Sequence, residues 1–314
     1  MRRFLKHSIL FLFGVITLFV VFLYASSAYI ASGDYFNVPK EVTMLFMGHS
    51  HSACAYEDNI IEGAYNISQN TEGYPYTYFK LKKLLEHNEQ ISRVFVEFTN
   101  NQITPFAKNR VSGSYLHVNM PRSFPVMAPS FVSAQFIQNK NPITIAKAIV
   151  KGSRSNAEFL TQPEQDYVTA QWRDHETPDR TFDPGDALRT TPGSSPPAQN
   201  TLPATNLDYL ARIVALCENR GVQLFFVRSP MPAKTQLPNE PQFQEQLASK
   251  RFAHVPFLDF KNYPLPNDRF ADKQHLNRRG QKQFSHFVND WFSTGALASD
   301  NPGLLLQNKM ETLR

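Results

Sequence analysis

The first thirty residues constrain this chain most, because they are too apolar to form an ordinary surface element. Residues 8–33 carry no charged side chain, and residues 9–24 are almost wholly apolar. A helix of about 20 apolar residues is long enough to cross a bilayer. Four basic or titratable residues precede the segment: Arg2, Arg3, Lys6 and His7. Since flanking positive charge stays in the cytoplasm, we expect the rest of the chain to be extracytoplasmic, and periplasmic in a Gram-negative cell.

A cleaved signal peptide is the competing interpretation of this segment. The small residues of Ala25-Ser-Ser-Ala28 are compatible with a cleavage site. The apolar stretch is nevertheless longer than the roughly 7–15 residues of a signal-peptide core. We therefore favour an uncleaved single-pass anchor in the cytoplasmic membrane, formed by residues 1–30 and followed by a tether over residues 31–40.

The rest of the chain has the composition of one large globular domain. The whole chain of 314 residues carries a net charge of +5 that is spread along it without a run of like charges, so no nucleic-acid partner is expected. Cys54 and Cys217 each lie in an apolar helical pattern. Two separate thiols are therefore favoured over a disulfide, although the disulfide stays an alternative.

Short apolar strands alternate with amphipathic helices. Strands are expected over residues 42–47, 65–68, 94–98, 222–227 and 255–258, and helices over residues 75–87, 207–219, 242–251 and 277–292. This alternation predicts a doubly wound α/β domain with a parallel sheet. Because such sheets bind ligands at the carboxyl ends of their strands, polar residues that follow strands are the first candidates for a functional site.

Two parts of the chain do not follow this alternation. Residues 103–170 contain scattered aromatic residues, which indicate a packed and partly helical excursion without a defined place in the fold. Residues 174–205 hold six of the 22 prolines and lack apolar periodicity, which predicts a mobile surface loop. The globular region thus divides into a first part at 41–173, the loop, a second part at 206–295, and a C-terminal tail at 296–314.

Ser50, Asp272 and His275 supply the parts of a nucleophilic site. Ser50 follows a glycine at the end of an apolar strand, and a serine hydroxyl needs an adjacent base to act as a nucleophile. His275 is such a base, and Asp272, three residues earlier, is placed to orient its ring. The competing interpretations are local: Ser50 as a helix N-cap, and the Asp–His pair as a surface cap at a helix start.

The chain resembles the SGNH branch of the GDSL hydrolases in four short blocks. Gly48-His49-Ser50 matches the nucleophile block, with His49 in place of the usual Asp, and Asp272-x-x-His275 matches the last block, including Leu276-Asn277 and Gly280. The third block, usually Gly-x-Asn-Asp, aligns with Phe98-Thr-Asn100-Asn101 but lacks its Gly and Asp. The resemblance implies a flavodoxin-like SGNH fold. It also implies that Asn100 and, more weakly, Gly73 stabilise the oxyanion.

The anchor narrows the resemblance to membrane-bound, extracytoplasmic members of that branch. The chain is similar to the D-alanyl transfer protein of teichoic-acid modification and to proteins that O-acetylate alginate and other exopolysaccharides. This similarity implies a serine acyltransferase or esterase that acts on O-acyl groups of a cell-envelope or exported polysaccharide. It also implies an integral-membrane acyltransferase as a partner that delivers the acyl group. Transferase and hydrolase share every residue of the mechanism, and the anchor favours the transferase.

Other functions remain open at this stage. The missing aspartate of the nucleophile block favours a non-catalytic SGNH-fold subunit or scaffold of an envelope assembly, and the aromatic content of 13% would suit a carbohydrate-binding module. His49 and His51 also invite a metal site. Zinc needs three or four ligands, and the sequence offers no third ligand at a suitable spacing. We therefore expect no metal or other cofactor, and assign both histidines to the pocket.

Overall fold

In a computed structural model, the described residues are 1–162, 165–173, 176–182, 202–233, 235, 237 and 239–313. Five parallel strands form one sheet in the order β2-β1-β3-β4-β5. The strands are β1 (Met44–Met47), β2 (Ala64–Asn66), β3 (Arg93–Glu97), β4 (Gln223–Arg228) and β5 (Phe257–Asp259). The predicted α/β class and parallel sheet are thus confirmed.

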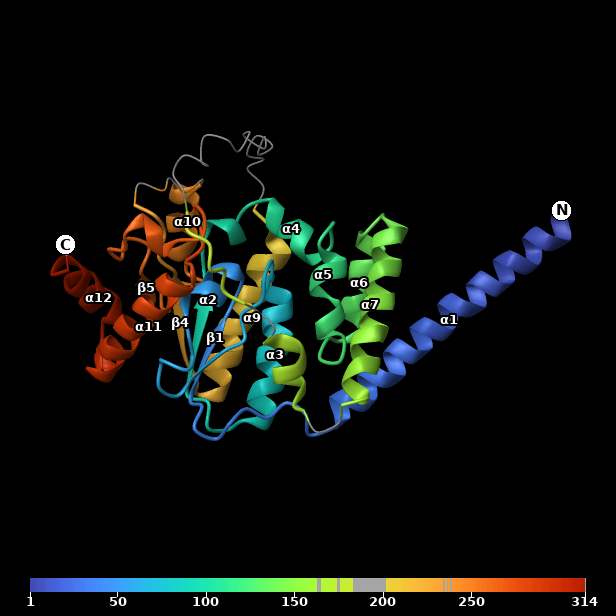
Figure 1. Cartoon of the computed structure of the whole chain (residues 1–314), viewed down its shortest axis with the longest axis horizontal. Helices are drawn as coiled ribbons and strands as arrows, with labels where there is room; N and C mark the ends of the chain where they lie inside the picture. Colours follow the sequence, from blue (N-terminus) through green and yellow to red (C-terminus); the bar gives the residue numbers. More distant parts are fainter. Residues whose placement is uncertain are drawn as a thin grey trace.

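Helices cover both faces of the sheet (Figure 1). Successive strand residues point to opposite faces, so Leu45 and Val94 join one apolar core while Phe46 and Phe95 join the other. The first core is completed by α3 (Tyr74–His87) and α9 (Ala204–Arg220), and the second by α2 (Ser50–Ala55) and α11 (Arg278–Ser293). Because both faces of these strands are buried, their sequences are continuous apolar runs rather than alternating ones.

The helix boundaries follow local signals in the sequence. Gly221 ends α9 in the left-handed conformation with a φ of 66°, which glycine adopts without strain. Asn277 caps α11 by accepting a hydrogen bond from the N–H of Gly280 at 3.0 Å. The remaining helices of the second part are α10 (Glu240–Leu247) and α12 (Pro302–Glu311). The predicted tail therefore contains a helix, which packs beside β5 through the buried Leu306.

The middle excursion is helical. It comprises α4 (Phe106–Val111), α5 (Leu116–Asn119), α6 (Pro129–Gln138) and α7 (Pro142–Leu160). Figure 1 shows these helices as a group beside α3, on the side of the domain that faces α1. The excursion thus thickens the domain between the sheet and the N-terminal helix.

The N-terminal helix α1 (Arg2–Ser32) is apolar and long enough to cross a membrane. Its first part projects from the domain, whereas Leu23, Ser26 and Ile30 are buried against it. The segment expected to be a tether is also packed, because Phe36 is fully buried with its ring against Tyr167. The chain therefore passes from α1 into the sheet through a packed connection.

Only part of the proline-rich segment can be compared with its prediction as a loop. Residues 176–182 pack on the domain: the N–H of Phe182 donates to Phe270 O at 2.7 Å, and the N–H of Arg278 donates to Pro178 O at 2.9 Å. These residues therefore lie along the loop before α11 as irregular chain, and their mobility stays a prediction. Residues 174–175 and 183–201 of this segment lie outside the described residues.

Candidate active site

Ser50 lies at the carboxyl end of β1, where a glycine turn starts α2. Gly48 has a φ of 146°, which favours glycine. A Cβ at this position would lie 2.6 Å from the Cβ of Glu97, so β3 also requires glycine here. His49 then caps α2, and Ser50 is the first helical residue, with its side chain half-buried.

A short closed loop holds Asp272 and His275. Phe270 and Leu276 form an antiparallel bridge, and the N–H of Ala271 donates to His275 O at 2.8 Å. Asn277, directly after the loop, donates from its side chain to Asp268 O at 2.8 Å and to Phe270 O at 3.2 Å. The Leu-Asn pair that follows the histidine in the sequence therefore fixes both ends of this loop.

The structure brings Ser50, His275 and Asp272 into one hydrogen-bonded line. His275 Nε2 lies 2.8 Å from Ser50 Oγ, and His275 Nδ1 lies 2.8 Å from Asp272 Oδ1. Because a carboxylate only accepts, the ring proton belongs on Nδ1, which leaves the Nε2 lone pair facing the serine hydroxyl. This is the tautomer that a general base for serine needs.

Asp272 is held as a carboxylate by its surroundings. Burial alone would raise its pKa, but the hydrogen bond and charge of His275, together with the N–H of Gln274 and the Arg180 guanidinium, lower that pKa well below its usual value. Oδ1 accepts from the N–H groups of Gln274 at 2.9 Å and His275 at 3.1 Å. Oδ2 accepts from Arg180 Nη2 at 2.9 Å. The acid is therefore fixed in orientation on both sides.

His49 and His51 lie behind the serine in the fully buried part of the site. His49 Nε2 lies 2.9 Å from Thr99 Oγ1, and its Nδ1 accepts from the N–H of His51 at 3.4 Å. The His51 ring stands edge-on to the His275 ring, with 5.1 Å between ring centres. Burial lowers the pKa of His51 to about 3, and it lowers the pKa of His49 as well. Both rings are therefore neutral at pH 7.

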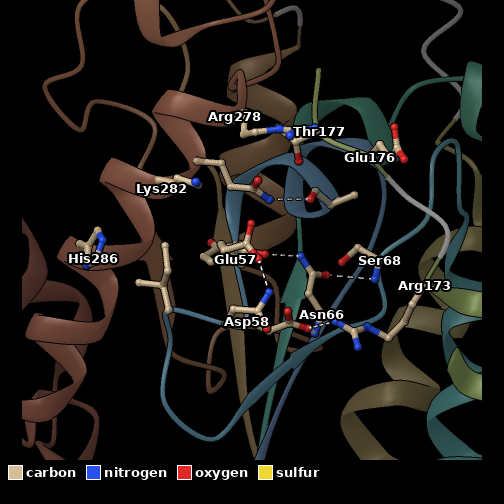
Figure 2. Close-up of a pocket in the computed structure, with 15 residues that line it drawn as sticks. Glu57, Asp58, Asn66, Ser68, Arg173, Glu176, Thr177, Arg278, Lys282 and His286 are labelled. Carbon is tan, nitrogen blue, oxygen red and sulfur yellow. Dashed lines mark hydrogen bonds and ion pairs between the residues drawn. The ribbon is translucent and has the colours of Figure 1, made fainter. Parts of the chain in front are cut away.

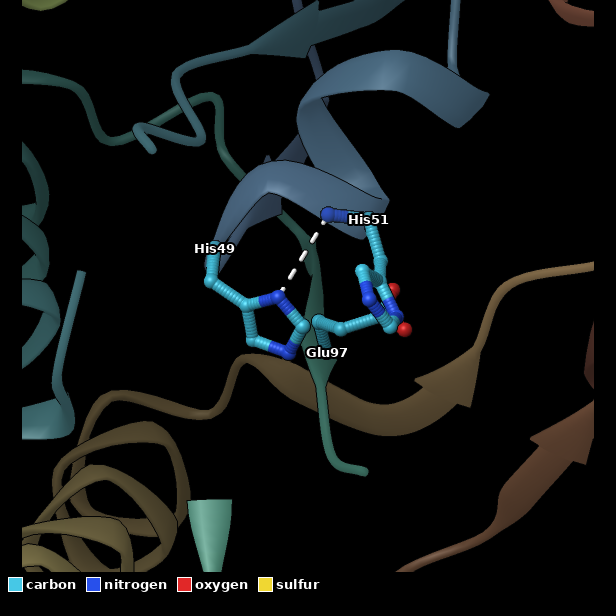
Figure 3. Close-up of side chains that lie close together, drawn as sticks. All are labelled: His49, His51 and Glu97. Atoms are coloured by element: carbon cyan, nitrogen blue, oxygen red, sulfur yellow. Dashed lines mark hydrogen bonds between the residues drawn. The ribbon is translucent and has the colours of Figure 1, made fainter. Parts of the chain in front are cut away.

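The structure adds a third potential ligand that the sequence did not reveal. His49, His51 and Glu97 form a buried cluster whose candidate ligand atoms lie within 4.8 Å of one another (Figure 3). Both nitrogens of His49 are already engaged, and Glu97 accepts from Ser229 Oγ at 2.6 Å and from Ser229 N at 3.0 Å. His51 Nδ1 is buried and lacks a hydrogen-bond partner among the described residues. In this histidine–glutamate cluster, His49 supports the α2 turn through its hydrogen bond from His51 N, whereas Glu97 is bonded to Ser229.

Asn100 and Gly73, the expected oxyanion residues, contact other parts of the domain. Asn100 Nδ2 donates to Glu240 Oε2 at 2.9 Å, and Asn100 Oδ1 lies 3.4 Å from Arg228 Nη1. A Cβ on Gly73 would meet Val111 Cγ2 at 3.0 Å, beside α4. None of these contacts brings either residue to Ser50.

Asn101, the next residue along, lies closer to the catalytic loop. Its Nδ2 lies 3.4 Å from Gln274 Oε1, and that oxygen is 3.3 Å from His51 Nε2. Gln274 directly precedes His275 in the chain. Sequence reasoning assigned the oxyanion role to Asn100 because it follows the family pattern. Two consecutive asparagines follow β3, so the sequence also offered Asn101 as an amide donor for the oxyanion.

A polar cavity of about 620 Å³ lies between α2, which carries Ser50, and α11, which follows His275 (Figure 2). Glu57 and Asp58, just after α2, line one side, and Arg278 and Lys282 of α11 line another. Arg173 lines it as well and pairs with Asp58 at 2.6 Å. The cavity therefore offers charged groups of both signs rather than an apolar surface.

Comparisons with known proteins identify little beyond this geometry. The model of an uncharacterised family matches residues 197–296, about a third of the chain. The matched segment contains Asp272 and His275 but not Ser50. No curated protein matches the chain. The case for a function therefore rests on the site itself.

Proposed function

We propose that this chain is a membrane-anchored, extracytoplasmic SGNH-type serine acyltransferase or esterase that acts on O-acyl groups of a cell-envelope or exported polysaccharide. The observation that carries the proposal is the continuous hydrogen-bonded line from Ser50 through His275 to Asp272. The first distance is that of a nucleophile and base that are ready to exchange a proton, and the second is that of a base oriented by an acid. A local cap would not require Ser50, 225 positions away in the chain, to meet the histidine.

The mechanism follows from the tautomer of His275. Ser50 Oγ attacks the acyl carbonyl carbon while its proton moves to His275 Nε2, and Asp272 stabilises the resulting imidazolium. The tetrahedral intermediate collapses when the leaving alcohol takes that proton, which leaves the acyl group on Ser50. A sugar hydroxyl or water then attacks the acyl-enzyme and gives its proton to His275, which passes that proton to Ser50 Oγ as the ester bond to the serine breaks. Transfer and hydrolysis differ only in this second acceptor.

Oxyanion stabilisation is assigned to donors near the start of α2. The N–H of Ser50 has no intrahelical acceptor, since it lies in the first turn of its helix. Asn101 is our side-chain candidate because its amide already contacts Gln274 beside the catalytic histidine. Fixed donors of this kind stabilise the developing charge without reorganisation.

The fold supports the SGNH assignment. The strand order 2-1-3-4-5 is the order of flavodoxin-like doubly wound sheets. Ser50 follows β1 and the Asn100–Asn101 pair follows β3, so residues after neighbouring strands meet at one edge. Ser50, Asp272 and His275 are not among the residues that line the polar cavity between α2 and α11, so the polysaccharide substrate rests on the family resemblance and the anchor.

We further propose that α1 is retained as a single-pass anchor in the cytoplasmic membrane. Signal cleavage within Ala25-Ser-Ser-Ala28 would remove Leu23 and Ser26 from their buried positions in the domain. The basic residues before the apolar stretch favour a cytoplasmic N-terminus, which makes the catalytic domain extracytoplasmic. An integral-membrane acyltransferase in the same bilayer is the partner that this arrangement suits.

A serine-directed fluorophosphonate probe tests the proposed nucleophile. We expect the full chain in detergent to be labelled, and Ser50→Ala to lose labelling. Ser52→Ala is the matched control, because Ser52 lies in the same helix but is fully buried and bonded to Ser68 Oγ at 2.9 Å. Labelling that survives in Ser50→Ala would overturn the assignment of the nucleophile, whereas a wild type that never labels would favour the non-catalytic scaffold.

A further inference from the structure

Arg110 of α4 is a buried cation with unsatisfied hydrogen-bond donors. The residue is 6% exposed, and its Nε and Nη1 atoms are buried without a hydrogen-bond partner within the described residues. Its guanidinium carbon lies 5.3 Å from the centre of the Phe106 ring. Burial lowers the pKa of Arg110 to about 10, so the group is still a cation at pH 7. Because a buried charge without a partner is strongly unfavourable, this guanidinium is suited to hold an anion.

Asn119 ties the backbone of Arg110 to the loop that follows β2. Asn119 Nδ2 donates to Arg110 O and to Thr71 O, each at 2.9 Å, and Thr71 Oγ1 donates to Asn119 Oδ1 at 2.8 Å. Thr71 has a φ of 62°, a strained conformation that persists only where the surroundings enforce it. The strain is thus held by the residues that position Arg110.

These residues follow the two strands on either side of the one that leads to Ser50. β1 lies between β2 and β3 in the sheet, the loop with Thr71 follows β2, and α4 follows β3. Burial is the main cause that lowers the pKa of His49 and His51, and the positive charge of Arg110 contributes as well. The guanidinium therefore lies within electrostatic reach of the turn that carries the nucleophile.

The acyl group is the part of the proposed substrate that suits a buried guanidinium. A polysaccharide chain is too large to enter the domain, so it must approach Ser50 and His275 from their partly exposed side. The acyl group is small and is attached to Ser50, so it can extend from the serine into the protein. A guanidinium binds a carboxylate through parallel charge-assisted hydrogen bonds, which a neutral acyl group cannot form.

We propose that Arg110 binds the terminal carboxylate of a four-carbon dicarboxylic acyl group, of the succinyl or fumaryl type, whose other end is carried by Ser50. The inference rests on the proposed acyl chemistry and adds the identity of the acyl group. Ser50 Oγ forms an ester with one carbonyl carbon, the bond from that carbon to the leaving alcohol breaks, and the serine proton passes through His275 to the alcohol. The second carboxylate does not react, so it keeps its charge and its pairing with Arg110.

A competition between two p-nitrophenyl esters tests this assignment. The full chain in detergent receives equal concentrations of mono-p-nitrophenyl fumarate and p-nitrophenyl crotonate, which differ in a carboxylate that replaces a methyl group. The trans double bond keeps that carboxylate from attacking its own ester. Mass spectrometry of the peptide that contains Ser50 gives the ratio of fumaryl to crotonyl groups. Arg110→Met removes the charge, and Lys108→Met, which removes an exposed charge from the same helix, is the matched control.

We expect the ratio of fumaryl to crotonyl groups in the wild type and in Lys108→Met to exceed that in Arg110→Met by about 10–100-fold, the range for hydrogen bonds to a charged group. Equal ratios in the wild type and Arg110→Met would overturn the role of Arg110 and leave the nucleophile intact. No acylation of Ser50 by either ester would overturn the proposed function and this inference with it. Arg110→Met should not lower the free energy of unfolding, since it removes an unpaired buried charge. A marked loss of stability would instead show that Arg110 has a structural partner.

Discussion

Replacing Asp272 by Asn separates two roles of the acid, its charge and its control of the His275 tautomer. Asn offers one acceptor oxygen where Asp offers two. Oδ1 of Asp272 accepts from two backbone N–H groups and from His275 Nδ1, whereas Oδ2 accepts, within the described residues, from the largely exposed Arg180. The backbone donors cannot move away, but Arg180 can turn to solvent. We therefore expect the Asn oxygen to take the Oδ1 position, which keeps the proton on Nδ1.

The expected loss of labelling rate in Asp272→Asn then comes from the missing negative charge alone. Two unit charges about 4 Å apart interact by about 4 kcal/mol at an effective dielectric constant of 20. Asp272 and His275 are 35% and 24% exposed, so solvent screening reduces this to roughly 2 kcal/mol. That corresponds to about 30-fold in rate. A lost tautomer costs far more, about 10⁴-fold in the serine-protease example.

The assay is the second-order rate of fluorophosphonate labelling of the full chain. Asp268→Asn is the matched control, because Asp268 lies just before the same loop and pairs with Arg269 instead. We expect that control to label at the wild-type rate. A 10⁴-fold loss in Asp272→Asn would refute the argument that the backbone N–H groups fix the acceptor. An unchanged rate would show that Asp272 does not assist His275 at all.

The remaining predictions concern the residues around the triad. Burial raises the pKa of Glu97 to about 7, so its contribution to stability is complete below its unfolded pKa of about 4.5 and is lost as pH rises through 7. The difference between these two pKa values corresponds to roughly 3 kcal/mol in the free energy of unfolding. Glu97→Gln should therefore make the free energy of unfolding in denaturant more nearly equal at pH 5 and pH 8. Treatment with EDTA should leave labelling and stability unchanged, and a loss that zinc restores would make the histidine–glutamate cluster a metal site. Asn101→Ala should slow labelling by about 10²-fold, whereas Asn100→Ala should slow it less; the reverse order would return the oxyanion role to Asn100.

The sequence predicted those features that local patterns determine. The strands are short apolar runs buried on both faces, and the caps at Gly221 and Asn277 are local signals, so the parallel sheet and α11 follow directly. The Asp–His pair is equally local, because a three-residue spacing suffices to bring the carboxylate to the ring. Ser50 required only a glycine turn after a strand.

The features that the sequence did not predict depend on distant contacts. Arg180 meets Asp272 across 92 positions and comes from a segment without periodicity. Glu97 is the last residue of an apolar strand, and only the close approach of β1 and β3 brings it to His49. Helix α7 of the excursion packs against α1 as well as against the rest of the domain, and its apolar pattern does not show which face meets which partner.

The most direct test of the account is whether an acyl group can be trapped on Ser50. The full chain is treated with p-nitrophenyl acetate, quenched in acid, digested and examined by mass spectrometry. We predict one acetyl group on the peptide that contains Ser50, its absence in Ser50→Ala, and a marked loss in His275→Ala. Acetylation of other residues with none on Ser50, or equal acetylation of Ser50 in His275→Ala, would contradict the claim that His275 activates this serine.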